Sequence, residues 1–176
     1  GAPPGGFAGA MGTPSHPGAD GPANLLASVR VAASGDARSR GVLVAFNDRV
    51  HAAREVTKTN SMNPDTFRSP EFGLLAVVEE DRVTWRRHAE STDPQLDADW
   101  GDLTNDVLAV YVTADVSSRN LVDGEDCAAV CLATTGAGHV PPRVVPWLED
   151  LREADVPVVA TTRCPEGRLA RSTYGF

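Results

Sequence analysis

The order of apolar and polar positions at the start of the chain predicts a loop followed by a helix. Residues 1–22 hold seven glycines and five prolines, a composition that resists helix and strand and is typical of a loop or a disordered tail. Apolar residues then recur at helical spacing over residues 24–33. Pro22 suits the first helical position, Asp20 lies near the positive end of the helix dipole, and Gly35 ends the helix. The apolar face predicted for this helix consists of Leu25, Leu26, Val29, Ala32 and Ala33.

Two further apolar blocks in the first half of the chain predict strands. Residues 41–46, "GVLVAF", are continuously apolar, which is typical of a strand covered on both faces in a parallel sheet. Residues 72–87 place extended segments on both sides of Glu80 and Asp81 and predict a β-hairpin. Between these blocks, the polar run "FNDRVHAAREVTKTN" (residues 46–60) gathers acids, a histidine, hydroxyls and a lysine. It could be a catalytic constellation or a structural segment that happens to be polar.

The second half of the chain alternates strands with helices. The predicted elements are strands at 107–112, 127–135 and 156–162, a short helix and turn over 117–126, and a longer helix over 141–155. Such alternation predicts right-handed βαβ units and a parallel, doubly wound sheet. Residues 88–106 are acidic, contain proline and lack this periodicity, so they are predicted to be an interdomain linker.

Composition narrows the classes of function. A chain of 176 residues suits one full domain, or one domain and part of another. A formal net charge of -8 without a Lys/Arg cluster argues against nucleic-acid binding, and no apolar run is long enough to span a bilayer. The three cysteines and four histidines show no metal-ligand spacing and no disulfide framework, so no metal site is predicted.

Candidate chemistry is expected beyond the carboxyl ends of the strands, where open parallel sheets bind ligands. The segments in that position are "NDRVH" (47–51), "TTGAGHVPP" (134–142) and "TTRCPEGR" (161–168). In the second segment, His139 could hydrogen-bond a ligand, or it could be an exposed side chain in an ordinary turn. Cys164 in the third would need a neighbouring base to act as a nucleophile, and the sequence shows none. No complete catalytic set is visible.

Several longer motifs occur in one order along the chain. They are "GAM…ADGPANLL", "GVLVAFND…HAAREVTKTN", "FRSPEFGLLAVV", "TTGAGHVPP" and "VPVVATTRCPEGR…YGF". This order resembles the second half of the bacterial L-asparaginase family, the threonine-dependent amidohydrolases. The resemblance extends from about Gly9 to Phe176, and "GVLV-x-x-ND" followed by "VTKT" is its most diagnostic part.

The resemblance implies a two-domain α/β fold. Residues 1–87 would be the C-terminal part of a flavodoxin-like domain, residues 88–106 a linker, and residues 107–176 most of a smaller Rossmann-like domain, here truncated. It also implies hydrolysis of asparagine to aspartate and ammonia through a threonine acyl-enzyme, with no metal and no organic cofactor. The substrate would be L-asparagine or L-glutamine, and further copies of the chain would be partners, as dimers paired into tetramers.

The residues that perform this reaction in the family have few counterparts here. Neither the nucleophile motif "TGGTI" nor the "GTD" motif occurs in these 176 residues, and the family's lysine falls on Pro3. No catalytic residue is therefore predicted, and the chain is expected to be a fragment that is inactive alone. One position matches: the family often has asparagine or histidine at the end of "G-x-G-[NH]", which makes His139 the expected substrate-binding residue.

An alternative of a different class is a non-catalytic binding or interaction module that kept the asparaginase fold. The asparaginase-like subunit of a transfer-RNA amidotransferase would need the same threonines and an extra N-terminal domain. The expected location is the cytoplasm, because sparse, unpaired cysteines fit a reducing compartment.

Overall fold

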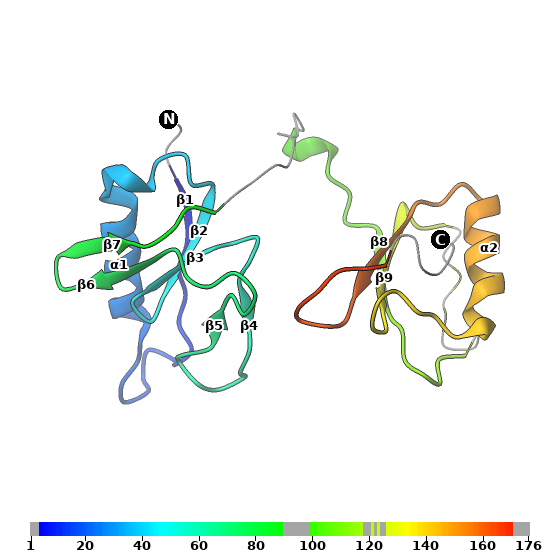
Figure 1. Cartoon of the computed structure of the whole chain (residues 1–176), viewed down its shortest axis with the longest axis horizontal. Coiled ribbons are helices and arrows are strands. Elements are labelled where there is room, and N and C mark those ends of the chain that lie inside the picture. Colours follow the sequence, from blue (N-terminus) through cyan, green and yellow to red (C-terminus); the bar gives the residue numbers. More distant parts are fainter. Residues whose placement is uncertain (1–3, 90–98, 118–120, 122, 124–125, 171–176) are drawn as a thin grey trace. The chain divides into compact units, whose positions relative to one another are not determined.

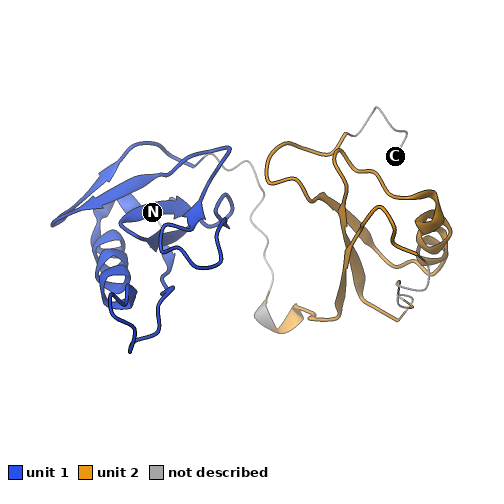
Figure 2. Cartoon of the chain, turned by 90° about the horizontal axis from the view of Figure 1, so that it is seen from below, with its two compact units in different colours: residues 1–93 blue, residues 94–176 orange. Residues whose placement is uncertain are grey.

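The computed structural model describes residues 4–89, 99–117, 121, 123 and 126–170. The chain divides into two compact units, Gly1–Asp93 and Pro94–Phe176, which Figure 2 shows in separate colours. In the described ranges, no helix is long and apolar enough to cross a membrane. Both units combine helix and strand, so the predicted α/β class is confirmed.

Unit 1 contains a mixed five-stranded sheet (Figure 1). Its strands, in their order across the sheet, are β1 (Gly5–Phe7), β2 (Val42–Phe46), β3 (Arg49–Ala52), β6 (Ala76–Glu79) and β7 (Arg82–Trp85). β1 and β2 are parallel and are connected by the helix α1 (Gly21–Ala33), whereas the other neighbours are antiparallel. A separate antiparallel ribbon consists of β4 (Thr57–Lys58) and β5 (Phe67–Arg68).

The chain reverses between β2 and β3 where the sequence analysis predicts only the end of a strand. Asn47 and Asp48 have φ angles of 50° and 57°, as a two-residue type I′ hairpin requires, and Asn tolerates this conformation better than most residues. The residues that follow form β3, in which Val50, His51 and Ala52 are buried. The predicted hairpin around Glu80 is confirmed, because Glu79 pairs with Arg82 across it.

The glycine-rich start of the chain also contains a strand. Gly5, Gly6 and Phe7 pair with Val42, Leu43 and Val44 in parallel register. The expectation of a loop or a disordered tail is therefore wrong at these three positions. Strand pairing uses backbone groups, so a neighbouring strand can order glycines that have little strand preference of their own.

Helix α1 lies at the predicted place but presents a different face to the sheet. Asn24, Ala27 and Val31 are buried, while Leu25 and Val29 of the predicted core face are 62% and 57% exposed. The small side chains Ala27 and Ala37 join the residues of the sheet in the core. This core contains Ala27, Val31, Ala37, Leu43, Ala45, Val50, Ala52, Leu75, Ala76 and Val78. A 3₁₀ turn, η1 (Gly35–Ala37), follows the helix.

Unit 2 contains a three-stranded parallel sheet, as predicted. Its strands, in their order across the sheet, are β10 (Val158–Thr162), β9 (Ala129–Thr134) and β8 (Val107–Tyr111). Its described residues also form η2 (Trp100–Asp102), η4 (Pro142–Val144) and the helix α2 (Val145–Glu153). The core contains Val112, Val116, Val130, Leu132, Val144, Leu151 and Val156. The helix predicted over 117–126 lies mostly outside the described residues.

Candidate functional site

The loop after β9 holds the one substrate-binding residue that the sequence predicts, His139. Its shape is set by the backbone: Thr135 N–H donates to the His139 carbonyl at 3.2 Å, and His139 N–H donates to the Thr135 carbonyl at 2.9 Å. The Thr135 hydroxyl donates to the same carbonyl of His139 at 3.0 Å. Gly136 and Gly138 have φ angles of 52° and 120°, which other residues rarely adopt. The result is a tight turn with an exposed histidine side chain.

The neighbouring loop after β10 is bonded to this turn. The Thr162 hydroxyl donates to the Gly136 carbonyl at 2.6 Å, and Arg163 N–H donates to the Thr134 carbonyl at 2.9 Å. The structure thus brings together two of the three segments that the sequence analysis selects. Cys164 is exposed, and its backbone N–H donates to the Thr162 hydroxyl at 3.0 Å. This contact involves the amide and gives the thiol no activating base.

A cavity of about 930 Å³ lies beside these loops. Its lining is mostly aliphatic and includes Leu132, Leu148, Val158, Ala160 and Leu169, with Arg168 also present. The segment after β10 borders it and is tied to the glycine turn, because Ala170 N–H donates to the Ala137 carbonyl at 2.9 Å. The geometry therefore places a preformed turn at the carboxyl ends of β9 and β10, where parallel sheets bind ligands, and the cavity extends from it along β10 to Val158 and Leu148.

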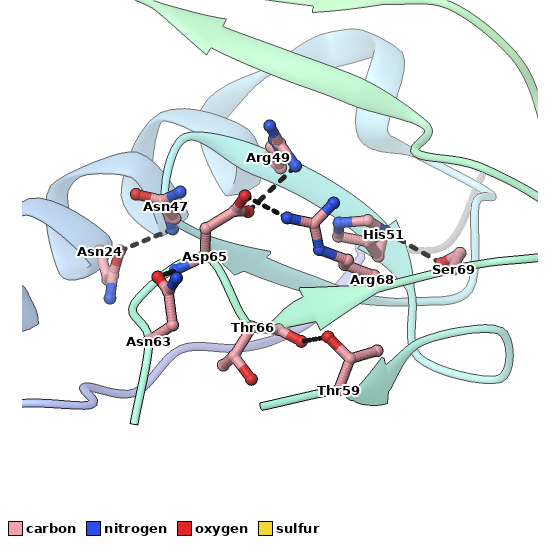
Figure 3. A network of polar contacts seen from close by, with 10 residues as sticks. All are labelled: Asn24, Asn47, Arg49, His51, Thr59, Asn63, Asp65, Thr66, Arg68 and Ser69. Carbon is pink, nitrogen blue, oxygen red and sulfur yellow. Dashed lines mark hydrogen bonds and ion pairs between the residues drawn. The ribbon is translucent and has the colours of Figure 1, made fainter. Parts of the chain in front are cut away.

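The polar run of unit 1 bonds to residues 65–69 in a network of polar contacts and does not form an open site (Figure 3). The Asp65 carboxylate accepts from Arg49 Nη1 at 3.0 Å and also from Arg68, and Asp65 N–H donates to the Asn63 side chain at 2.9 Å. The Thr59 hydroxyl donates to the Thr66 carbonyl at 2.8 Å. Each of these bonds fixes the ribbon of β4 and β5 or attaches it to β3. This pattern favours the structural interpretation of the run.

His51 lies on β3 beside Ser69 (Figure 3) and is 3% exposed. Its Nδ1 shares a hydrogen bond with the Ser69 hydroxyl at 2.9 Å (Figure 3), and its buried Nε2 makes no hydrogen bond in the described part of the chain. Burial lowers the pKa of His51, and the charges of Arg49 and Arg87 lower it further. The ring is therefore held neutral and inaccessible, which suits a structural residue better than a proton-transfer group.

Asp20 has a role that the sequence analysis misses. Its carboxylate accepts from Met11 N–H at 3.0 Å, from Gly12 N–H at 2.9 Å and from the Asn24 amide at 2.9 Å. The Gly12 N–H bond is the main cause that lowers the pKa of Asp20. Asn24 in turn accepts from Asn47 N–H at 2.9 Å, at the hairpin turn. The "ADGPANLL" motif therefore links the first loop, α1 and the β2–β3 turn, although the spacing of Asp20 and Asn24 signals only a helix start.

The described residues contain no group of three or more His, Cys, Asp or Glu side chains that could hold a metal ion. The site geometry is thus that of a backbone-shaped turn with neighbouring hydroxyls. Such a turn can hold a small polar ligand by hydrogen bonds, but it contains no activated nucleophile.

Comparison with known proteins identifies the family to which the chain is similar. The family profile described as "Asparaginase, N-terminal" matches residues 7–91, and the profile described as "Glutaminase/Asparaginase C-terminal domain" matches residues 106–175. A relative named probable periplasmic L-asparaginase, from Haemophilus influenzae, is 34% identical over 96% of this chain and 51% of its own length. L-asparaginase 2 of Escherichia coli is 32% identical over 96% of this chain and 51% of its own length.

A solved structure shows the same fold. The crystal structure of a probable cytoplasmic L-asparaginase from Campylobacter jejuni matches with a TM-score of 0.87 and 29% identity, over 97% of this chain and 58% of that one. The chain thus spans about half the length of the curated relatives it matches. The profile matches, the identity and the shared fold together show that this chain belongs to the bacterial L-asparaginase family.

Proposed function

We propose that these residues form the C-terminal half of an L-asparaginase-type amidohydrolase, which converts asparagine to aspartate and ammonia through a threonine acyl-enzyme. The observation that supports this most directly is the ordered match of two asparaginase profiles to residues 7–91 and 106–175. The threonine motifs of the reaction are not in the 176 residues. In this proposal, the chain supplies scaffold and part of the substrate site, while the nucleophile comes from the other half of the fold.

We assign residues 1–87 to the first asparaginase domain, 88–106 to a linker and 107–176 to the second domain. His139 is the proposed substrate-binding residue, because the turn that holds it is closed by backbone hydrogen bonds and follows the carboxyl end of β9. L-asparagine is the proposed substrate, with L-glutamine as a second one, since a Pseudomonas fluorescens relative is named glutaminase-asparaginase. We also propose that the chain assembles into a homo-oligomer.

A cytoplasmic location is part of the proposal. The similar Campylobacter jejuni structure is described as cytoplasmic, whereas the Haemophilus influenzae relative is named periplasmic. Fractionation of the source cell, with detection of the chain by an antibody, tests the location. Recovery of the chain from the periplasm would contradict it.

Ammonia release tests the reaction. The chain alone should release no ammonia from asparagine. A chimera that places the unaligned half of the Haemophilus influenzae relative before Gly1 should release it. In that chimera, His139→Ala should raise KM for asparagine about tenfold with little change in kcat, as expected when a ligand hydrogen bond worth about 1.4 kcal/mol is lost.

The matched control is Glu149→Ala, an exposed position on α2 outside the loop. A chimera that folds cooperatively but releases no ammonia would contradict the proposed function. Calorimetric binding of asparagine to the chain alone, without turnover in the chimera, would instead favour the alternative of a non-catalytic binding module.

A further inference from the structure

Arg163 directly follows β10 and bonds to the ends of both other strands of the unit 2 sheet. Its backbone N–H donates to the Thr134 carbonyl at the end of β9, at 2.9 Å. Its Nη1 donates to the carbonyl of Val112, the residue after β8, at 2.6 Å. Since β9 lies between β10 and β8, this one residue spans the carboxyl ends of all three strands.

The bond from Arg163 to Val112 satisfies a buried carbonyl. Val112 is 0% exposed, so its carbonyl is shielded from bulk water, and a buried carbonyl without a partner is costly. The guanidinium of Arg163 also lies over the ring of Tyr111, with Cζ 4.4 Å from the ring centroid. A cation is attracted to the face of an aromatic ring, so Tyr111 helps to hold the guanidinium beside the Val112 carbonyl.

These bonds enclose the two residues that precede the glycine turn. Val112 N–H donates to the Ala133 carbonyl at 3.0 Å on the β8 side, and Arg163 N–H donates to the Thr134 carbonyl on the β10 side. The bond from Arg163 Nη1 to Val112 joins the two sides. The result is a closed ring of contacts through Val112, Ala133, Thr134 and Arg163, which we call the strand-end brace.

The strand-end brace connects to the turn at two points. Thr134 is followed in the chain by Thr135, whose N–H and carbonyl close the turn with His139. Thr162, the residue before Arg163, donates its hydroxyl to the Gly136 carbonyl at 2.6 Å. A displacement of Arg163 would therefore move both the base and the side of the turn. A binding group must be held within about 0.5 Å of its productive position, so such a movement would weaken contact with a ligand.

We propose that Arg163 is a positioning residue for substrate binding, which acts through the strand-end brace to hold the turn that presents His139. In this role it acts through the turn and not by contact with the substrate. The inference rests on the proposed function, because it takes His139 as the substrate-binding residue. The competing explanation is a surface arginine that stabilises unit 2 without any effect on the substrate.

Amide exchange in the chain alone tests the strand-end brace without any reaction. The N–H groups of Gly138 and His139 both donate to the Thr135 carbonyl, so these amides should exchange slowly in the unsubstituted chain. Arg163→Ala should speed both about tenfold, because the turn opens more often. The Val130 amide, which donates to the Pro157 carbonyl inside the sheet, should stay slow if unit 2 remains folded. Unchanged exchange at Gly138 and His139 in Arg163→Ala would overturn the proposal.

The chimera with the unaligned half of the Haemophilus influenzae relative tests the effect on the substrate. Arg163→Ala should raise KM for asparagine about fivefold with kcat unchanged, which is less than the effect of His139→Ala because the histidine is still present. In the double variant, KM should equal that of His139→Ala within about twofold, since no side chain is left to position. A multiplied effect of about fiftyfold would show that Arg163 does not act through His139.

Two further substitutions separate the donated bond from the volume of the side chain. Arg163→Lys keeps a cation that can lie over Tyr111 and donate to the Val112 carbonyl, so KM should stay within about twofold of the unsubstituted chimera. Arg163→Met keeps an unbranched side chain without the donor, and it should behave as Arg163→Ala does. Equal KM values in the lysine and methionine variants would contradict the role of the bond.

Arg152→Ala is the matched control. Arg152 is an exposed arginine in the last turn of α2, and it borders Val158 at the amino end of β10, whereas Arg163 follows the carboxyl end. This change should leave both KM and the exchange of Gly138 and His139 unaltered. Equal effects of Arg152→Ala and Arg163→Ala would assign them to the loss of a positive charge and overturn the proposal.

The outcomes separate this inference from the proposed function. Faster exchange of the turn in Arg163→Ala, with no ammonia from the unsubstituted chimera, keeps the role of Arg163 in holding the turn and removes the proposed reaction. Ammonia release with the same KM in the unsubstituted chimera and in Arg163→Ala keeps the reaction and removes the positioning role.

Discussion

The polar run of unit 1 and the glycine turn of unit 2 are held by different kinds of hydrogen bond. Side chains of the run bond to those of residues 65–69: Arg49 donates to Asp65, which also accepts from Arg68, and His51 shares a hydrogen bond with Ser69. In the turn, main-chain bonds between Thr135 and His139 fix the loop, and the Thr135 and Thr162 hydroxyls donate to its main-chain carbonyls. The run has more of the residue types that catalyse reactions, yet its buried histidine is neutral and enclosed.

The difference shows that residue types alone are a poor guide to a site. A side chain that completes its hydrogen bonds inside the fold has little capacity left for a ligand. A loop whose shape is fixed mainly through its main-chain groups can expose a side chain to a ligand, and the loop keeps its shape when that side chain is changed. We therefore expect substitutions in the network of unit 1 to change stability, and substitution of His139 to change ligand binding instead.

The largest loss of stability is expected for Asp20→Ala. The change removes the acceptor for Met11 N–H, Gly12 N–H and the Asn24 amide. Charge-assisted bonds of this kind contribute about 1.5–3 kcal/mol each in isolation, and their loss is not additive, so we expect about 3 kcal/mol. The loss is measured by urea unfolding of unit 1, with amide exchange in β2 and β3 as the readout.

The pH dependence of stability that Asp20 contributes tests the same hydrogen bonds. Because the Gly12 N–H bond lowers the pKa of Asp20, the folded state releases this proton more readily than the unfolded chain. The stabilisation is therefore present above the ordinary aspartate pKa of 3.8 and is lost as the pH falls through the lower folded-state value. Asp20→Asn should remove this acid-sensitive part. An unchanged acid transition in Asp20→Asn would show that the carboxylate is not the stabilising group.

A smaller loss, about 1–2 kcal/mol, is expected for Ser69→Ala, because Nδ1 of the buried His51 then lacks its partner. The measurement is again urea unfolding of unit 1 at neutral pH. Thr84→Ala, which removes an exposed hydroxyl bonded to Glu79, is the control and should change stability by less than about 0.5 kcal/mol. Equal losses in the two variants would contradict the special role of the buried pair.

His51 also predicts a pH dependence with a definite sign. Since burial lowers its pKa, the unfolded chain binds this proton at a higher pH than the folded protein does. Stability is then greatest above the ordinary histidine pKa of 6.5 and decreases as the pH falls from there toward the folded-state value. Replacement by Leu should flatten the stability of unit 1 across this window. A slope that persists in His51→Leu would assign the effect to another group.

The sequence predicts the secondary structure of both units well where apolar periodicity is strong. The strands at 107–112, 127–135 and 156–162 and the hairpin at Glu80 follow the predicted pattern. β1 escapes prediction because its order comes from pairing with β2, a contact distant in sequence. β3 escapes because buried His51 reads as polar, although the Asn47–Asp48 pair is a usable hairpin signal.

The helix face and the candidate site show what a pattern leaves out. The apolar periodicity predicts the helix α1, but both of its flanks are apolar. The pattern therefore does not show which flank faces the sheet. In the structure Ala27 and Val31 face the sheet, whereas Leu25 and Val29 face outward. The motif order locates the loop of His139, since the loop position follows from the strand before it. It does not reveal the bond between Thr162 and Gly136, which joins two loops that lie far apart in sequence.

The smallest change in stability is expected for His139→Ala, which should alter the unfolding free energy of unit 2 by less than about 0.5 kcal/mol. The bonds that shape the turn involve the main chain of His139, and alanine keeps them. Gly138→Ala is the contrasting variant, since φ is 120° there and an added Cβ would lie 3.4 Å from Leu169. We expect it to cost about 1–3 kcal/mol. Urea unfolding of unit 2 compares the two variants. An equal loss of unfolding free energy would mean that the His139 side chain helps to hold the turn, as the His51 side chain does in unit 1.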